Sequence, residues 1–279
     1  MFLLALMSSF FNAAVTLYAK KIMLEMKDSH SFIVTSFIPV SILLALSMPW
    51  LFSFQVNMAS VCLLVMIILF DTVSNILFFK SMEKIEVSRL AVYSSLTPLF
   101  TFLPNIFING FHTKTLISVL FIVLGIYFLN LKGRNPLAPL IELKKAGNML
   151  GILASVMIGI SMVPTQQLLI HEWTNAPTLY LMRATGISLL IYIIYRPKIW
   201  FPKLNVSLGL RGVLSIIQWM CLLTALKWAD GTLVVALAYT SPLFVLFLAR
   251  VYFKEKITIP KVAACVITIL GIVWTMMEQ

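Results

Sequence analysis

The sequence predicts an all-α membrane protein with ten transmembrane helices arranged as two inverted five-helix repeats, and three observations predict this fold. The 279 residues are 61% hydrophobic and only 11% charged, with a mean hydropathy of +1.00, which excludes an ordinary soluble domain. Ten apolar runs have about the length of 17–25 residues that crosses the hydrocarbon core. An internal sequence repeat then relates the first five runs to the last five.

Each apolar run is predicted to be a helix, because only a helix satisfies the backbone of one isolated segment inside lipid. The runs are also too long and too uniform for the strands of a barrel. The first run lacks a basic segment before it and a small-residue cleavage pattern after it, so it is predicted to be a retained helix and not a signal peptide. In chain order the runs are 2–21, 31–53, 58–79, 88–108, 114–131, 149–170, 177–195, 207–226, 232–252 and 259–277.

The connections are short except for residues 132–148, a segment with prolines, glycines and four basic residues that we interpret as a cytoplasmic linker. It separates a first repeat, 1–131, from a second, 149–279. A shift of 144 residues places Leu-Thr-Pro-Leu-Phe at 96–100 on Thr-Ser-Pro-Leu-Phe at 240–244. Because each repeat has an odd number of spans, the second copy inserts upside down, which suits a molecule that opens alternately to the two sides.

Basic residues gather in the connections that follow the odd-numbered spans. Eighteen of the 21 lysines and arginines are assigned to these connections, Arg211 among them, whereas the opposite face holds only Lys114 and Lys227. Arg183 lies within the seventh span. The positive-inside rule therefore predicts that the odd-numbered connections are cytoplasmic and that both termini lie outside. Almost none of the +11 net charge forms a solvated basic face, so nucleic acid is not an expected partner.

Several short motifs resemble those of the EamA-type members of the drug/metabolite transporter superfamily. The resemblance covers nearly the whole chain and implies a ten-helix carrier of metabolites, with two tandem five-helix copies, in the plasma or inner membrane. It also implies a role such as metabolite export. The residues that carry the resemblance are Leu96-Thr97-Pro98, Thr240-Ser241-Pro242, Gly125, Gly271, Ala225-Leu226-Lys227, Arg183 and Phe253-Lys254-Glu255.

Asp71 is the first candidate for a functional residue, because it is the only acidic residue deep within a predicted span. An ionised carboxylate at that depth costs at least about 2.5–3.5 kcal/mol, which usually indicates a function. It would serve as a proton-coupling group or as a counter-ion for an amine; alternatively it is structural and bonds to neighbours such as Asn75, one turn later. Arg183 would bind a substrate carboxylate, pair with Asp71, or extend to the membrane interface.

Other polar and aromatic side chains project from the central turns of several spans. They would either line one shared cavity or hold helices together through hydrogen bonds of about 0.6 kcal/mol each. Tyr93 and Tyr239 flank the two proline motifs, where they would stack on a cation or simply pack. Pro98 and Pro242 are a candidate pair of hinges, or static kinks. The candidate substrate-binding residues are Asp71, Asn75, Asn12, Arg183, Gln218, Trp219, Tyr93, Tyr239 and Gln166.

A secondary carrier of a small organic solute is the function that the sequence favours, with alternating access and, as its specific version, proton coupling through Asp71. The alternatives are an intramembrane enzyme and a non-transporting membrane scaffold or channel. An enzyme would need a second buried carboxylate or a nucleophile–histidine pair, whereas His30, His112 and His171 all fall in connections. A channel would need rings of charges that the sequence lacks.

The expected partners are the solute, a proton in the coupled version, and the lipid bilayer. An arginine and an aspartate in one cavity suit a zwitterion such as an amino acid, whereas a solitary aspartate among tyrosines suits an amine, and the sequence leaves both open. No metal or cofactor is expected, since the three cysteines are far apart within apolar runs. No Gly-rich nucleotide loop is found, so a gradient is the expected driving force. The sequence makes no prediction of the oligomeric state.

Overall fold

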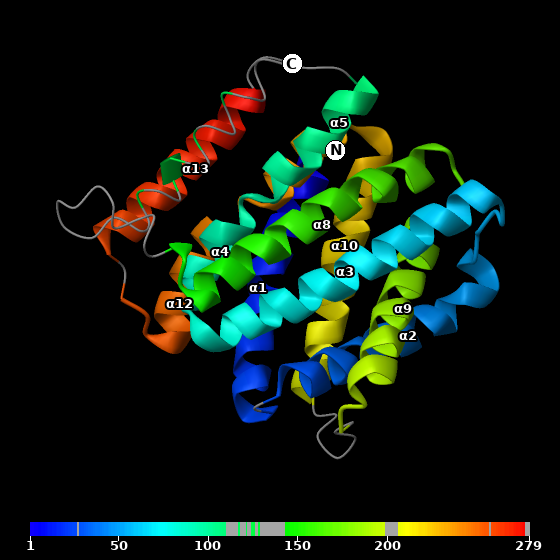
Figure 1. The fold of residues 1–279 in the computed structure, drawn as a ribbon, viewed down its shortest axis with the longest axis horizontal. Helices are drawn as coiled ribbons and strands as arrows, with labels where there is room; N and C mark the ends of the chain where they lie inside the picture. Colours follow the sequence, from blue (N-terminus) through cyan, green and yellow to red (C-terminus); the bar gives the residue numbers. More distant parts are fainter. Residues whose placement is uncertain are drawn as a thin grey trace.

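The computed structural model describes residues 1–26, 28–109, 117, 121, 124–125, 128, 143–198, 206–256 and 258–276. Within these residues the protein is helical, and its only extended pairing is an isolated bridge between Phe54 and Thr174. The helices, shown in Figure 1, are α1 (Phe2–Met26), α2 (Ser29–Leu51), α3 (Met58–Lys84), α4 (Val87–Ser94), α5 (Thr97–Asn109), α8 (Ala146–Ile170), α9 (Ala176–Tyr195), α10 (Val206–Trp228), α11 (Gly231–Ala238), α12 (Pro242–Phe253) and α13 (Ile259–Met276).

Seven of the described helical segments are long and apolar enough to cross a membrane: α1, α2, α3, α8, α9, α10 and the combined segment Gly231–Phe253 of α11 and α12. Large apolar side chains such as Ile42 and Phe247 remain exposed on their outer surfaces, as contact with lipid requires. The predicted span 114–131 lies mostly outside the described residues. The multi-pass, all-helical character is therefore confirmed, and the number of ten spans stays a prediction.

The helix ends are set by short polar side chains. The Asp28 carboxylate accepts hydrogen bonds from the backbone N–H groups of His30 and Ser31 at the start of α2, at 3.2 and 3.0 Å. Asn57 and Ser60 form a reciprocal capping box at the start of α3. These caps satisfy N–H groups that have no partner inside the helix, so they fix where each span begins.

Two of the predicted spans, 88–108 and 232–252, are interrupted at the same place in the sequence repeat. The first divides into α4 and α5 just before Pro98, and the second divides into α11 and α12 at Pro242. Proline lacks an N–H group, so it fits the first turn of a new helix. The two prolines thus lie in the first turn of the second helix of each interrupted span, and not inside a continuous helix.

The two interruptions contact each other. The Ser95 hydroxyl, between α4 and α5, donates a hydrogen bond of 3.3 Å to the backbone oxygen of Tyr239, between α11 and α12. These two residues are 144 positions apart, which is the period of the sequence repeat. Around them α3 packs along α8, and α1 packs along α10 (Figure 1). In the same way α4 contacts α12 and α5 contacts α11. These pairs of neighbours are unchanged when the two predicted halves are exchanged.

The connection before α3 is joined to the connection before α9. The backbone N–H of Gln55 donates to the backbone oxygen of Trp173 at 2.8 Å, and the Asn175 side chain donates to the Leu51 oxygen at 2.6 Å. At the opposite end of the bundle, Glu255 after α12 accepts a 3.0 Å hydrogen bond from the Val87 N–H at the start of α4. Each end of the bundle therefore has its own contacts between segments that are distant in the sequence.

Candidate solute-binding pocket

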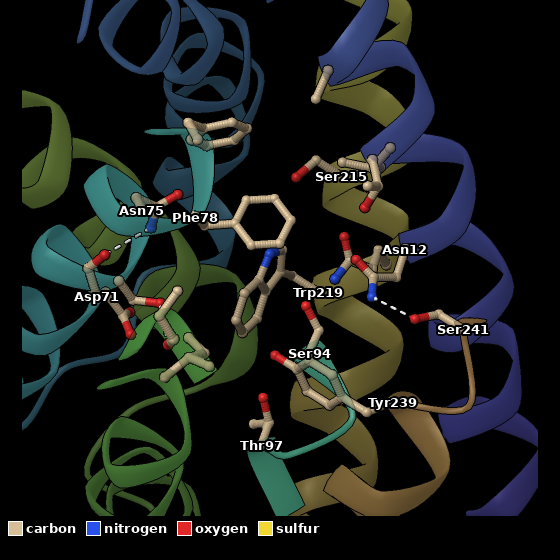
Figure 2. Close-up of a pocket in the computed structure, with 18 of the residues that line it drawn as sticks. Asn12, Asp71, Asn75, Phe78, Ser94, Thr97, Ser215, Trp219, Tyr239 and Ser241 are labelled. Carbon is tan, nitrogen blue, oxygen red and sulfur yellow. Dashed lines mark hydrogen bonds between the residues drawn. The ribbon is translucent and has the colours of Figure 1, made fainter. Parts of the chain in front are cut away.

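A cavity lies between helices of both predicted halves, with about 140 Å³ of space open to water molecules. Since roughly 10–15 Å³ measured in this way holds one water, the cavity has room for several waters or a small organic molecule. Figure 2 shows Asp71 and Asn75 on one side of it, Asn12 and Ser241 on the opposite side, and the rings of Phe78 and Trp219 between them. The wall is thus a mixture of polar and aromatic groups, as is typical of small-molecule sites.

The pocket lies toward one end of the bundle. Of α3 only residues 71–79 contribute to its wall, which is the second half of that helix, and of α8 only residues 154–158, in its first half. In α10 the contributing residues are 211–219, which run from its first half to just past its middle. These parts of α3, α8 and α10 lie toward the odd-numbered connections, which the distribution of basic residues predicts to be cytoplasmic, whereas Tyr180 and Arg183 contribute from the first half of α9, toward the other end.

Asp71 and Arg183 form a buried ion pair, and they are 1% and 2% exposed. The Arg183 Nε donates to the Asp71 Oδ2 at 2.7 Å, and the Nη2 lies 2.6 Å from the same oxygen. The Ser161 hydroxyl donates to the other oxygen, Oδ1, at 2.6 Å. The Arg183 guanidinium also lies over the Trp219 ring, 4.2 Å from its centroid. The two opposite charges therefore neutralise each other. Of the three roles predicted for Arg183, the structure shows the pairing with Asp71.

A hydrogen bond from Asn75 to the Asp71 carboxylate was one prediction from the sequence, and the structure does not have it. The side-chain nitrogen of Asn75 donates instead to the backbone oxygen of Asp71, at 2.8 Å, and Asn75 lines the pocket. Asn12 reaches across from α1 and donates to the Ser241 hydroxyl at the start of α12, at 3.3 Å. Gln218, Trp219 and Tyr239 are also on the pocket wall.

Tyr93 and Gln166 do not line the pocket. Tyr93 is fully buried in α4 beside α8, where the Ser155 hydroxyl donates to its backbone oxygen at 3.0 Å. The Gln166 side chain donates to the Ala229 oxygen at 3.1 Å, near the even-numbered end of α8. Both residues have the depth or the motif position that the sequence analysis used, but their helices turn them toward neighbouring helices.

Arg211 lines the pocket, although the sequence analysis assigned it to a cytoplasmic connection. It lies in α10 and is only 4% exposed, and its guanidinium carbon is 5.1 Å from the centroid of the Phe32 ring. Its Nε and Nη1 atoms are buried and make no hydrogen bond with the described residues. The assignment was wrong because α10 continues through this position. The signal was present, since Arg211 falls inside the predicted span 207–226.

A bundle of apolar helices around a buried polar pocket defines the class of multi-pass membrane proteins. The chain belongs to the EamA-like transporter family, whose model matches residues 1–131 and 145–277. This match confirms the family resemblance seen in the sequence. Members of the family are membrane transporters of small solutes and not enzymes, so the protein is a membrane transporter.

A crystal structure of another protein, 16% identical, has the same fold with a TM-score of 0.68. The alignment covers 99% of this chain and 95% of that chain. The comparison with curated proteins gives no match.

Proposed function

We propose that the protein is a secondary carrier that moves a small organic solute across the plasma or inner membrane by alternating access through this pocket. The observation that carries the proposal is the meeting of the two interrupted helices at the pocket. Ser94 and Thr97 reach its wall from the first interruption, and Tyr239 and Ser241 reach it from the second (Figure 2). A helix that is already divided bends at that point without losing further backbone hydrogen bonds.

In this proposal the halves are inverted five-helix repeats, residues 1–131 and 149–279, joined by the linker 132–148. The exchange symmetry of the helix contacts supports this arrangement. Much of the pocket wall lies toward the end of the bundle that carries the odd-numbered connections. This position fits a conformation in which the pocket is accessible from the predicted cytoplasmic side. Exposure to the other side would require the hydrogen bonds between the segments 51–55 and 173–175 to break.

The coupling version of the proposal uses the Asp71–Arg183 pair. A proton taken up by Asp71 would cancel the charge that holds Arg183 and would release the guanidinium toward the solute. An intramembrane enzyme and a scaffold are not favoured, because the family is one of transporters.

Alternating access is tested by labelling single cysteines in proteoliposomes. The three native cysteines, Cys62, Cys221 and Cys265, are first replaced, and Ser94→Cys is then introduced into the pocket wall. A membrane-impermeant maleimide is expected to label this cysteine from either side, because the pocket opens to both in turn. Ile42→Cys, on the lipid-exposed surface of α2, is the control and should label from neither side. Labelling of Ser94→Cys from one side only would contradict alternating access.

Coupling is tested with Asp71→Asn in the same proteoliposomes. Solutes are first found by thermal-shift screening against amino acids, polyamines, sugars and nucleosides, since a bound ligand raises the melting temperature. The variant should exchange a bound solute across the membrane but should no longer accumulate it in response to a pH gradient. Unchanged accumulation would eliminate Asp71 as the coupling group.

A further inference from the structure

The geometry points to Arg211 as the anchor for a carboxylate of the transported solute, which makes the substrate an organic acid or an amino acid and not a simple amine. This inference rests on the proposed carrier function and assigns its substrate class. Three observations carry it: the charges on the pocket wall, the surroundings of Arg211, and the pairing of Asp71 with Arg183.

The described part of the pocket wall has one unbalanced positive charge. Its charged side chains are Asp71, Arg183 and Arg211. The first two neutralise each other at 2.6 Å, so the charge of Arg211 is left. A buried cation without a partner is costly, and proteins normally pair such groups. Because no described carboxylate forms an ion pair with Arg211, a bound anion is the partner that would complete the site.

Arg211 packs against an aromatic ring and has free donors. The Phe32 ring covers one side of its guanidinium, while Nε and Nη1 have no acceptor among the described residues. Ser215, one helical turn later, lies on the same face of α10, and its hydroxyl is fixed at 2.6 Å from the Tyr180 hydroxyl. The planar donors of arginine match the two oxygens of a carboxylate.

The rest of the wall suits an organic body and not a second charge. Trp219 follows Arg211 two turns later on α10 and lines the pocket together with Phe78. Apolar contact with these rings would hold the carbon skeleton of the solute while Arg211 holds its carboxylate.

Both oxygens of Asp71 already have partners, so an amine would have to compete with Arg183 for this carboxylate. Its Oδ2 accepts from Arg183 and its Oδ1 from Ser161. Among the described residues it is also the only acidic one on the pocket wall. An ammonium group would therefore find neutral acceptors, such as the side-chain oxygens of Asn12 and Asn75. Such acceptors suit the ammonium of an amino acid whose carboxylate is already held, and are weak anchors for an amine alone.

The experiment measures thermal unfolding of the purified full chain in detergent, with matched pairs of probes. The pairs are L-alanine with L-alaninamide, L-leucine with L-leucinamide, and 4-methylpentanoate with 4-methylpentanamide. Within each pair only the carboxylate is replaced by an amide. The wild type should be stabilised by at least one carboxylate and much less by its amide. Arg211→Met should abolish that shift, and Arg211→Lys should keep part of it because the charge is retained.

A second readout needs no ligand. If Arg211 binds the solute, it has no partner for its charge when the pocket is empty. Arg211→Met then removes an unpaired buried charge, so the variant without ligand should have a melting temperature equal to or above that of the wild type. A structural arginine would give the opposite sign. Arg250→Met is the matched control: it loses the same charge from an exposed site on α12 and should keep the wild-type ligand shift.

The outcomes separate this inference from the carrier proposal. The inference is overturned if no carboxylate stabilises the wild type, if amides stabilise it equally, if Arg211→Met keeps the carboxylate shift, or if that variant melts below the wild type. Transport of amines in proteoliposomes alongside any of these results would leave the carrier proposal intact. Conversely, a carboxylate that binds through Arg211 but never crosses the membrane would uphold the anion site and overturn the carrier.

Discussion

The two buried arginines of the pocket occupy different flanks and differ in their partners. Arg183 belongs to what we call the α8 flank, formed by α3, α5, α8 and α9, where it forms an ion pair with Asp71. Arg211 belongs to the α1 flank, formed by α1, α10 and α12, where its Nε and Nη1 donors meet no acceptor among the described residues. The two arginines are thus almost equally buried, but only the charge of Arg183 is balanced by a carboxylate among the described residues.

Both flanks are held together by close contacts between helices. On the α8 flank, Gly159 lets α8 approach α5 so closely that an added Cβ would lie 2.6 Å from the Phe100 Cβ and 2.7 Å from the Thr97 oxygen. On the α1 flank, α1 contacts the start of α12 and the turn before it through the 2.8 Å hydrogen bond between Ser9 and Thr240, the 3.3 Å bond from Asn12 to Ser241, and buried apolar side chains. The two flanks therefore differ in the pairing of their arginines and not in how closely their helices pack.

Breaking the ion pair on the α8 flank should have the largest effect. Arg183→Gln leaves the Asp71 carboxylate buried with Ser161 as its main partner, and such a loss typically costs about 3–5 kcal/mol. The melting temperature in detergent should fall sharply, whereas Arg211→Gln should not lower it.

The double variant Asp71→Asn/Arg183→Gln is the control for this prediction. It has no buried charge at the pair and should recover much of the lost stability, since the two groups act as a unit. Equal destabilisation by the Arg183 and Arg211 variants would remove the contrast between the flanks.

Filling the close contact of α8 should have the next largest effect. Gly159→Ala places a methyl group against the Cβ of Phe100 and the backbone of Thr97, so the helices must move apart, at a typical cost of about 1–3 kcal/mol. Gly209→Ala, on α10, is the matched control, because nothing lies within 4 Å of its added Cβ. That variant should be stabilised by up to about 1 kcal/mol through helix propensity. Unfolding curves of the two variants with opposite signs would support the close approach of α8 to α5; the same sign would contradict it.

The α8 flank could be partly predicted from the sequence. A lone carboxylate in an apolar run needs a partner within the membrane, and one arginine within another span was the natural candidate. Asp71 and Arg183 were identified on that reasoning, and the structure joins them. The repeat likewise drew attention to Pro98 and Pro242 as hinges or kinks, and the structure divides a helix at each of these positions.

Arg211 could not be assigned in the same way. It is close to the end of its span, where the positive-inside rule explains a basic residue without any further role. What buries it is the approach of α10 to α2, where an added Cβ on Gly212 would lie 3.1 Å from Pro39. Tyr93 and Gln166 were placed at the pocket for a related reason: helices that are apolar on all sides carry no pattern that tells which side faces the cavity.

The smallest effect is expected at Asp28, which lies between α1 and α2 and supports the first turn of α2. That turn includes Phe32, the ring beneath Arg211, so its stability matters to the α1 flank. Partial burial alone would raise the pKa of Asp28, but the hydrogen bonds from the Ser31 hydroxyl and from the backbone of Ser31 and His30 outweigh it and lower the pKa below its ordinary value.

The carboxyl of Asp28 releases its proton more readily in the folded protein than in the unfolded chain. The contribution of the Asp28 carboxylate to stability is therefore complete above the unfolded pKa of about 3.9, and it is lost as the pH falls through the lower, folded pKa. Asp28→Asn keeps a capping side chain and should lose that acid-dependent part of the stability, whereas Asp28→Ala should lose about 1 kcal/mol at neutral pH. Melting temperatures followed from neutral pH to below about pH 4 check the sign. If the wild type and Asp28→Asn lose stability in parallel on acidification, the cap has no share in the acid sensitivity. In that case packing alone holds Phe32 in place, and the contact of Arg211 with the Phe32 ring does not depend on the charge of Asp28.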